Sequence, residues 1–288
     1  MSKKKFSEQL PLETGLFSIP DSTDPHKLTG RAKRPQTKKA AKAIPESQQP
    51  FLPGLSRRGR PRSPRELSTR LDAWSAQDIV AWAVETFGPK LCVAASMGDT
   101  VLIDLATKVD PDIEVVFLDT GFHFPETLLT VRKAQQRYSL NLRVERAKPS
   151  VGDLFSLGTD GCCAARKVAV LDRVMAEKDA WMTGLRRDEA ESRRHTPILG
   201  RDKRGVVKVC PIANWSDDDV TRYTLEHDVI VNPLQYQGYP SIGCWPCTSK
   251  VVDGEDARSG RWAGSGKTEC GLHLWPLRST AAPALPSI

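Results

Sequence analysis

The sequence predicts an α/β protein built on a doubly wound, mostly parallel sheet. Apolar runs typical of buried parallel strands lie at residues 91–96 and 114–119, and a third strand is predicted at residues 142–147. Between them, residues 101–109 and 125–138 are predicted helices. This β-α-β-α-β alternation predicts helices on both faces of the sheet and ligands at the carboxyl ends of its strands.

The remaining elements flank this unit. A helix is predicted at residues 79–87, where apolar side chains recur at helical spacing and a Gly-Pro pair then stops the helix. Further along the chain we expect a helix at 164–177, strands at 181–184 and 206–212, and a helix that starts at Ser216 with a capping-box pattern.

Composition divides the chain into three parts. Residues 1–70 carry 16 Lys and Arg against 6 Asp and Glu, so the net charge of +7 comes from this stretch. It is rich in Pro, Ser, Lys and Arg and lacks hydrophobic periodicity, which predicts a disordered basic extension. Residues 71–257 are expected to form the folded, nucleotide-binding domain. Residues 258–288, first glycine-rich and then rich in Pro and Ala, are expected to be a mobile C-terminal segment.

An Arg-Gly-Arg-Pro run within residues 57–62 matches the core of an AT-hook, which binds the minor groove at A·T pairs. We favour the alternative, an arginine-rich tail that meets a short pattern by chance. Nucleic-acid contact by the extension stays open as the weaker hypothesis, and such binding would be sensitive to salt.

The cysteines indicate a reducing compartment. They number seven, an odd count, and no signal peptide precedes them, because no apolar region follows the lysines at residues 3–5. No apolar run approaches the length needed to span a bilayer. We therefore expect a soluble, cytoplasmic protein whose thiols bind metal or do chemistry.

Four of the cysteines form two close pairs. Cys162 and Cys163 are adjacent, and Cys244 and Cys247 form a C-x-x-C about eighty residues later. Two such pairs would supply a four-thiolate metal centre if the fold brings them together. Adjacent ligands strain the tetrahedral geometry of zinc, so the spacing favours an iron-sulfur cluster and leaves zinc as the alternative.

Lys167 and the cysteines at 92 and 210 are interpreted from their positions in predicted helices and strands. Lys167 lies four residues after Cys163, so it would share a helix face with this ligand and place an ammonium group beside the centre. A solvated helix lysine is the alternative. Cys92 and Cys210 lie in predicted strands and are expected to be buried core thiols.

Polar turns at the carboxyl ends of the strands form a candidate nucleotide site. The turn at residues 96–100, with Ser96 and Gly98, leads a strand into a helix N-terminus and so forms an anion site. Asp119 ends the next strand, where it would reach a ribose hydroxyl or cap the following turn. Arg186 follows a later strand at the same edge of the sheet.

The C-terminal segment supplies cations and one isolated thiol. Arg258 and Arg261 offer forked guanidinium groups suited to phosphate or sulfate. Cys270 lies near His273 in this basic stretch, and neighbouring positive charge favours the thiolate that a nucleophile requires. An exposed C-terminal cysteine without a function is the weaker alternative.

Together these motifs resemble a known family. The shared runs lie at residues 118–127 (Leu-Asp-Thr-Gly-Phe-His-Phe-Pro-Glu-Thr), 162–163 with Arg166 and Lys167, 183–187 (Thr-Gly-Leu-Arg-Arg), 215–217 (Trp-Ser-Asp), 238–248 (Gly-Tyr-Pro-Ser-Ile-Gly-Cys-Trp-Pro-Cys-Thr), 258–262 (Arg-Ser-Gly-Arg-Trp) and 269–273 (Glu-Cys-Gly-Leu-His). In this order they resemble the assimilatory adenylylsulfate (APS) reductases of the phosphoadenylylsulfate (PAPS) reductase family, with its adenine nucleotide alpha hydrolase-like fold.

The resemblance implies a chemistry and a role for each candidate residue. Cys270 would attack the sulfur of APS and release AMP, and thioredoxin or a similar dithiol would then release sulfite from the S-sulfocysteine. A 4Fe-4S cluster would be held by Cys162, Cys163, Cys244 and Cys247. The phosphosulfate is assigned to Lys167, Arg258, Arg261 and His273. The nucleotide is assigned to the turn with Ser96 and Gly98, to Asp119 and to Arg186.

Two alternatives remain. Family members that use the 3'-phosphorylated PAPS generally lack the two cysteine pairs, so the pairs favour APS, and a PAPS reductase with the same mechanism is the nearer alternative. A DNA-associated zinc-binding protein is the alternative from another class. The turn at residues 96–100 lacks the fuller serine- and glycine-rich loop of the related ATP pyrophosphatases, which fits an enzyme that does not cleave ATP.

Overall fold

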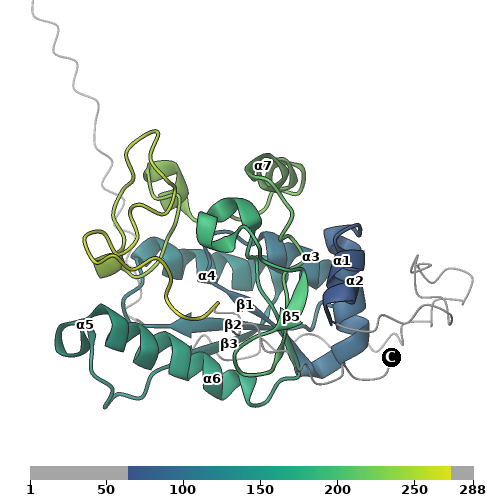
Figure 1. Ribbon diagram of the computed structural model, residues 1–288, viewed down its shortest axis with the longest axis horizontal. Coiled ribbons are helices and arrows are strands. Elements are labelled where there is room, and N and C mark those ends of the chain that lie inside the picture. The colour runs from purple at the N-terminus through teal and green to yellow at the C-terminus, as the bar shows by residue number, and fades with distance from the viewer. Residues whose placement is uncertain (1–63, 274–288) are drawn as a thin grey trace, which may run out of the picture.

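The structure, a computed structural model, describes residues 64–273 (Figure 1). Within them a six-stranded sheet has the order β3-β2-β1-β4-β6-β5. Neighbouring strands pair in parallel except β5 with β6. The predicted mostly parallel sheet is therefore confirmed. The strands are β1 (Leu91–Ala95), β2 (Glu114–Asp119), β3 (Asn141–Arg146), β4 (Ala180–Met182), β5 (Leu199–Arg201) and β6 (Val207–Val209).

Helices cover both faces of this sheet, with α3 and α4 on one side and α5 and α6 on the other (Figure 1). The α-helices are α1 (Pro64–Leu71), α2 (Ala76–Phe87), α3 (Val101–Val109), α4 (Pro125–Tyr138), α5 (Leu154–Cys163), α6 (Ala169–Met175) and α7 (Asp217–Glu226). A π-helical turn, Ala164–Val168, joins α5 to α6. Short 3-10 turns lie at Gly88–Lys90, Arg187–Glu189, Glu191–Arg193, Pro233–Gln237 and Trp245–Cys247.

Alternation along the strands builds a separate core on each face. Val93 and Met182 join the larger core, which contains apolar side chains of α2, α3 and α4. Their neighbours Cys92 and Trp181 point to the opposite face and pack with α6. Each fully buried apolar side chain of the size of valine or methionine stabilises the fold by roughly 1.5 to 3 kcal/mol. Both faces are thus covered, as a doubly wound sheet requires.

The first described helix begins earlier than the sequence predicts. Most of α1 falls within residues 1–70, which were expected to be disordered, yet its Leu67 and Leu71 are buried in the larger core. Ser68 Oγ also accepts a hydrogen bond from Leu199 N of β5, at 3.1 Å. Two apolar residues one turn apart are too few to produce a periodic signal. The AT-hook-like run at 57–62 lies outside the described residues.

Cys162 and Cys163 precede a helical segment, as predicted, because the π-helical turn and α6 follow them. The pair also ends a helix, α5, that the sequence did not predict. Asp153 caps α5 by accepting hydrogen bonds from Phe155 N and Ser156 N, at 3.1 and 3.0 Å. Gly158 interrupts this helix with a φ of 64°, which hides the helical pattern in the sequence. The strand β5 was also missed, because its sequence, Leu-Gly-Arg, contains a glycine and no apolar run, unlike the equally short β4 and β6. No helix within residues 64–273 has the length and apolarity to cross a membrane.

Asn232 ties the turn after β1 to the rest of the domain. Its buried Nδ2 donates to Met97 O and Thr127 Oγ1, at 3.1 and 3.0 Å, and its Oδ1 accepts from Leu234 N at 3.1 Å. Its backbone N–H donates to Gly98 O at 2.9 Å. Because Met97 adopts a left-handed φ of 62°, these bonds hold the turn in a conformation that it would otherwise leave.

Replacing Asn232 by Ala should therefore lower the free energy of unfolding by about 2 to 4 kcal/mol, because buried polar groups lose their partners. Asn141→Ala is the matched control: its exposed side chain makes one bond, to Asp112 O at 3.0 Å, and its loss should cost less than about 1 kcal/mol. Urea unfolding followed by circular dichroism measures both variants. Equal losses would contradict the anchoring role of Asn232.

Candidate active site

One pocket of about 260 Å³ opens at the carboxyl ends of β1, β2 and β4. Its volume is close to the roughly 300 Å³ at which small-molecule sites begin. The C-terminal segment, yellow in Figure 1, lies over this edge of the sheet. Most of the predicted catalytic and substrate-binding residues line the pocket, namely Ser96, Gly98, Lys167, Arg258, Arg261, Cys270 and His273.

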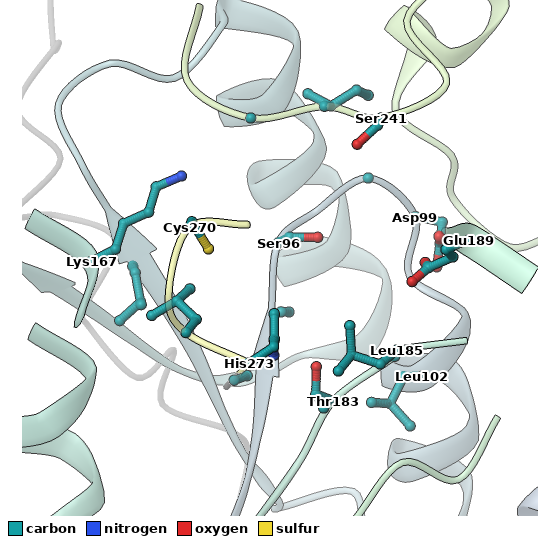
Figure 2. Close-up of a pocket in the computed structure, with 18 of the residues that line it drawn as sticks. Ser96, Asp99, Leu102, Lys167, Thr183, Leu185, Glu189, Ser241, Cys270 and His273 are labelled. Carbon is teal, nitrogen blue, oxygen red and sulfur yellow. The ribbon is translucent and has the colours of Figure 1, made fainter. Parts of the chain in front are cut away.

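The turn after β1 has the predicted strand-turn-helix geometry. Asp99 Oδ1 accepts a hydrogen bond from Val101 N at 3.0 Å, at the start of α3. Burial raises the pKa of Asp99 above its ordinary value, although this bond acts in the opposite direction. Figure 2 shows Ser96 and Asp99 on the loop that borders the pocket. The turn therefore presents polar atoms and a helix N-terminus to a ligand.

Asp119 and Arg186 do not line the pocket that the other predicted substrate-binding residues line. Asp119 Oδ1 accepts from Gly121 N at 2.9 Å, and its other oxygen pairs with Arg146. Capping the turn after β2 was one of the two roles expected for it. Arg186 Nη2 donates to Asp217 Oδ1 at 2.6 Å, at the start of α7. Because both side chains are tied to neighbouring elements, their assignment to the nucleotide stays a prediction.

Two guanidinium groups lie together in the pocket. Arg258 Nη1 and Arg261 Nη1 are 3.5 and 3.3 Å from Ser241 Oγ, and Arg261 stacks on Trp262 with 4.4 Å between its guanidinium carbon and the ring centre. Burial, followed by the charge of Arg258, lowers the pKa of Arg261. The buried Arg261 Nε finds no hydrogen-bond partner within residues 64–273. A bound anion would satisfy this donor and offset both charges.

Cys270 and His273 end the described chain inside the pocket. Cys270 is half-buried, and Figure 2 shows its thiol and the Lys167 side chain projecting into the pocket. Gly271 has a φ of 86°, which glycine adopts without strain. This turn lets His273 stack on Trp181, with ring centres 5.9 Å apart. Burial holds the pKa of His273 well below its ordinary value, so its imidazole is neutral at pH 7.

The four paired cysteines line a second, smaller cavity. Cys162 and Cys163 come from the end of α5, whereas Cys244 precedes the 3-10 turn Trp245–Cys247 and Cys247 ends it. Cys247 N donates to Cys244 O at 2.9 Å, and Cys244 Sγ lies 3.3 Å from Thr120 Oγ1. The fold thus brings together two pairs that lie far apart in the sequence, as predicted.

This donor set fits a thiolate-ligated centre. Among the described residues, the lining of the cavity includes four thiols and two cations but no carboxylate. Burial, and then the neighbouring Cys163 and Cys244, raise the pKa of Cys162, whereas a metal centre would stabilise the thiolates. No three His, Cys, Asp or Glu side chains in residues 64–273 form a group that could hold a metal ion. Zinc, with bonds of about 2.3 Å, would require sulfurs within about 4 Å of one another.

Lys167 lines both cavities. It lies in the π-helical turn Ala164–Val168, where the wider turn changes which side chains share a face; such turns are frequent at functional sites. The sequence predicted the proximity of Lys167 to the cysteines but gave no sign of the π turn. Lys167 therefore connects the thiol cavity with the pocket that contains Cys270.

Sequence reasoning missed three charged residues that line the larger pocket, Glu189, Arg193 and Glu269. Arg193 Nε and Nη2 donate to Glu269 Oε1 and Oε2, at 2.8 and 3.0 Å, and its Nη1 donates to Glu189. Glu269 belongs to the Glu-Cys-Gly-Leu-His run, which was the available signal. Arg193 ends the 3-10 turn Glu191–Arg193, in a stretch without a recognised motif.

Comparisons with known proteins agree with this geometry. The model of the phosphoadenosine phosphosulfate reductase domain family matches residues 90–250. The chain is 49% identical over 221 residues to the adenosine 5'-phosphosulfate reductase of Streptomyces coelicolor, covering 74% of this chain and 92% of that protein. It is 47% identical over 232 residues to the adenosine 5'-phosphosulfate reductase of Rhodococcus opacus, covering 73% and 94%.

A solved structure of a reductase is also similar to this chain. The phosphoadenylyl-sulfate (PAPS) reductase from Candida auris, crystallised as a phosphate complex, superposes with a TM-score of 0.56 at 30% identity, covering 64% of this chain and 94% of that one. With the family match over more than half of its length, the chain belongs to the phosphoadenosine phosphosulfate reductase family.

Proposed function

We propose that this chain is a sulfur-group oxidoreductase that reduces APS to sulfite and AMP in sulfate assimilation, with Cys270 as its nucleophile. The observation that carries the proposal is that Cys270 lines one pocket with Lys167, Arg258 and Arg261, at the carboxyl edge of the sheet. Relatives between 42% and 49% identical over most of the chain are named adenosine 5'-phosphosulfate reductases.

In the first half-reaction, the Cys270 thiolate attacks the sulfur of the phosphosulfate. A sulfur–sulfur bond forms, the bond from that sulfur to the bridging phosphate oxygen breaks, and AMP leaves with the electron pair. Negative charge grows on the bridging oxygen, so the cations at Arg258 and Arg261 stabilise the transition state. The enzyme is left with an S-sulfocysteine at Cys270. Neutral His273 would contribute a hydrogen bond without adding charge.

In the second half-reaction, a dithiol of the thioredoxin type attacks Sγ of Cys270. The sulfur–sulfur bond breaks, and sulfite leaves with the electron pair. The second thiol of the reductant then displaces Cys270 as a thiolate. The two electrons that reduce the substrate therefore come from the dithiol.

We infer that Cys162, Cys163, Cys244 and Cys247 hold a 4Fe-4S cluster. Four thiols line one cavity, and the adjacent ligands Cys162 and Cys163 strain the tetrahedral geometry of zinc, which favours a cluster. When bound, the cluster would supply a compact charged group beside Lys167. The side chain of Lys167 would then be oriented between this group and the substrate.

APS is favoured over PAPS as the substrate, because the chain has both cysteine pairs and because its relatives carry the APS name. The observation that favours PAPS is the 30% identity to the reductase from Candida auris, which is well below the identity to the bacterial proteins. We also infer a cytoplasmic location, and a reductase domain at 71–257 followed by a catalytic segment from residue 258. Residues 274–288 of the expected mobile segment lie outside the described residues.

Replacing Cys270 by Ser should lower thioredoxin-dependent sulfite release by a factor on the order of 1,000 or more, because the hydroxyl is a far weaker nucleophile. AMP affinity, measured by calorimetry, should not change. Cys210→Ala is the matched control: this buried thiol packs in the larger core, and its loss should change the rate only a few-fold. A Cys270→Ser variant that keeps its activity would refute the proposal.

Anaerobically purified protein should be brown and contain about four irons and four sulfides per chain. Cys163→Ser and Cys247→Ser should each lower the iron content and the visible absorbance. Cys92→Ala should change neither, because this residue of β1 packs in the core on the α6 face of the sheet. A colourless protein with one zinc per chain would support the DNA-associated zinc-binding alternative instead.

Turnover of APS and PAPS under the same conditions should show a kcat/KM at least about 100-fold higher for APS, since a poorly accommodated, extra phosphate costs several kcal/mol. Sulfite release with each nucleotide in parallel measures the ratio. A preference for PAPS would overturn the choice of substrate and leave the role of Cys270 intact.

A further inference from the structure

The residue before Cys270 is held by a strong ion pair. Arg193 Nε and Nη2 donate to the two carboxylate oxygens of Glu269, at 2.8 and 3.0 Å, and Arg258 Nη2 lies 3.3 Å from Oε2. The Arg193 and Glu269 side chains are only 12% and 17% exposed. Two parallel bonds between largely buried charges fix both distance and orientation, which an exposed ion pair does not do.

Arg193 is also bound by a second carboxylate, that of Glu189. Its Nη1 donates to Glu189 Oε2 at 2.5 Å, and Glu189 Oε2 also accepts from Arg186 N at 3.2 Å. Burial acts to lower the pKa of Arg193, but its hydrogen bonds to Glu269 and the charges of Glu189 and Glu269 outweigh burial and raise the pKa. Arg193 is thus a charged, fixed point on the loop that follows β4.

The other contacts that hold the segment around Cys270 differ in strength. Lys267 pairs with Asp160 at 2.6 Å, but Asp160 is 91% exposed, so this pair is expected to contribute little. After Cys270, Leu272 packs against the core on the α6 face and His273 stacks on Trp181. On the N-terminal side of Cys270, Arg258 Nη2 donates to Thr268 O at 3.0 Å and Ser192 Oγ donates to Glu269 Oε1 at 3.3 Å. The two bonds from Arg193 to Glu269 are the strongest contact there, because they are bidentate and join two charges.

We propose that Arg193 is a positioning residue that holds the Cys270 thiol in the pocket by clamping Glu269. The proposal rests on the proposed role of Cys270 as nucleophile. Attack requires Sγ in line with a bound phosphosulfate, so the clamp serves the first half-reaction. Reduction by a protein dithiol requires access to the half-buried Cys270, so the segment must move outward and the clamp must open. The clamp therefore favours attack and opposes reduction.

Measuring the two half-reactions separately tests this division. Arg193→Gln and Glu269→Gln should each slow AMP release in a single turnover without reductant by about 10- to 100-fold, because each breaks the two charged hydrogen bonds that join Arg193 to Glu269. The double variant should be no slower than the slower single variant. Once the adduct has formed, thioredoxin should discharge it from each variant as fast as from the wild type, or faster.

Arg137→Gln is the matched control. It breaks an ion pair of 2.8 Å with Asp228, which is 94% exposed, and should change neither rate more than about twofold. Additive losses in the double variant, or weaker AMP binding by Arg193→Gln alone, would overturn the clamp, because Arg193 would then act on the nucleotide directly. Equal slowing of both half-reactions would also overturn it.

A readout without turnover separates failure of the clamp from failure of the proposed function. Alkylation of Cys270 by iodoacetamide, followed by peptide mass spectrometry, should be faster in Arg193→Gln and Glu269→Gln than in the wild type, because the segment is released. Unchanged alkylation rates would overturn the clamp. If the wild type releases no AMP from APS, the proposed function fails, and the alkylation rates still decide whether the clamp exists.

Discussion

Two buried guanidinium groups in one pocket are the physical constraint on which the site depends. Burial lowers the pKa of both Arg258 and Arg261. The charge of Arg193 lowers the pKa of Arg258 further, and the charge of Arg258 does the same to Arg261. The protein offsets the charge of Arg258 with Glu269 at 3.3 Å, whereas Arg261 Nε has no partner within residues 64–273. An anion with several oxygens would accept a hydrogen bond from this donor and offset the two positive charges, and a phosphosulfate is such an anion.

The fold explains how these charges meet a nucleophile. The chain leaves β1 toward β2 and β3 and then returns to β4 on its other side, and ligands bind where a doubly wound sheet reverses its strand order in this way. The turn after β1 supplies one wall, and the segment with Cys270 supplies another. Gly243, the residue before Cys244, lets the guanidinium of Arg261 lie against the backbone, because any side chain at that position would overlap it. Lys167 lines both cavities. The anion site and the thiol cavity are therefore parts of one structure.

Local patterns predicted the elements and the residues whose chemistry is unusual. Apolar runs gave the strands near β1 and β2, and the cysteine spacing gave the four-thiol cavity. Features that depend on distant partners were missed. Arg193 and Glu269 lie 76 residues apart, and nothing near either residue indicates their pairing. Asp119 and Arg186 occupy the expected edge of the sheet, but Arg146 and Asp217 engage them. The short helix α1 and the π turn with Lys167 have no periodic signal of their own.

The central claim is that the thiol of Cys270 accepts the sulfonate group of the substrate. Intact protein incubated with APS in the absence of any reductant can be digested and its cysteine peptides examined by mass spectrometry. We expect a sulfonate on the peptide that contains Cys270, lost on addition of thioredoxin together with release of sulfite. A sulfonate on another cysteine, or none on any peptide while AMP is released, would contradict the claim.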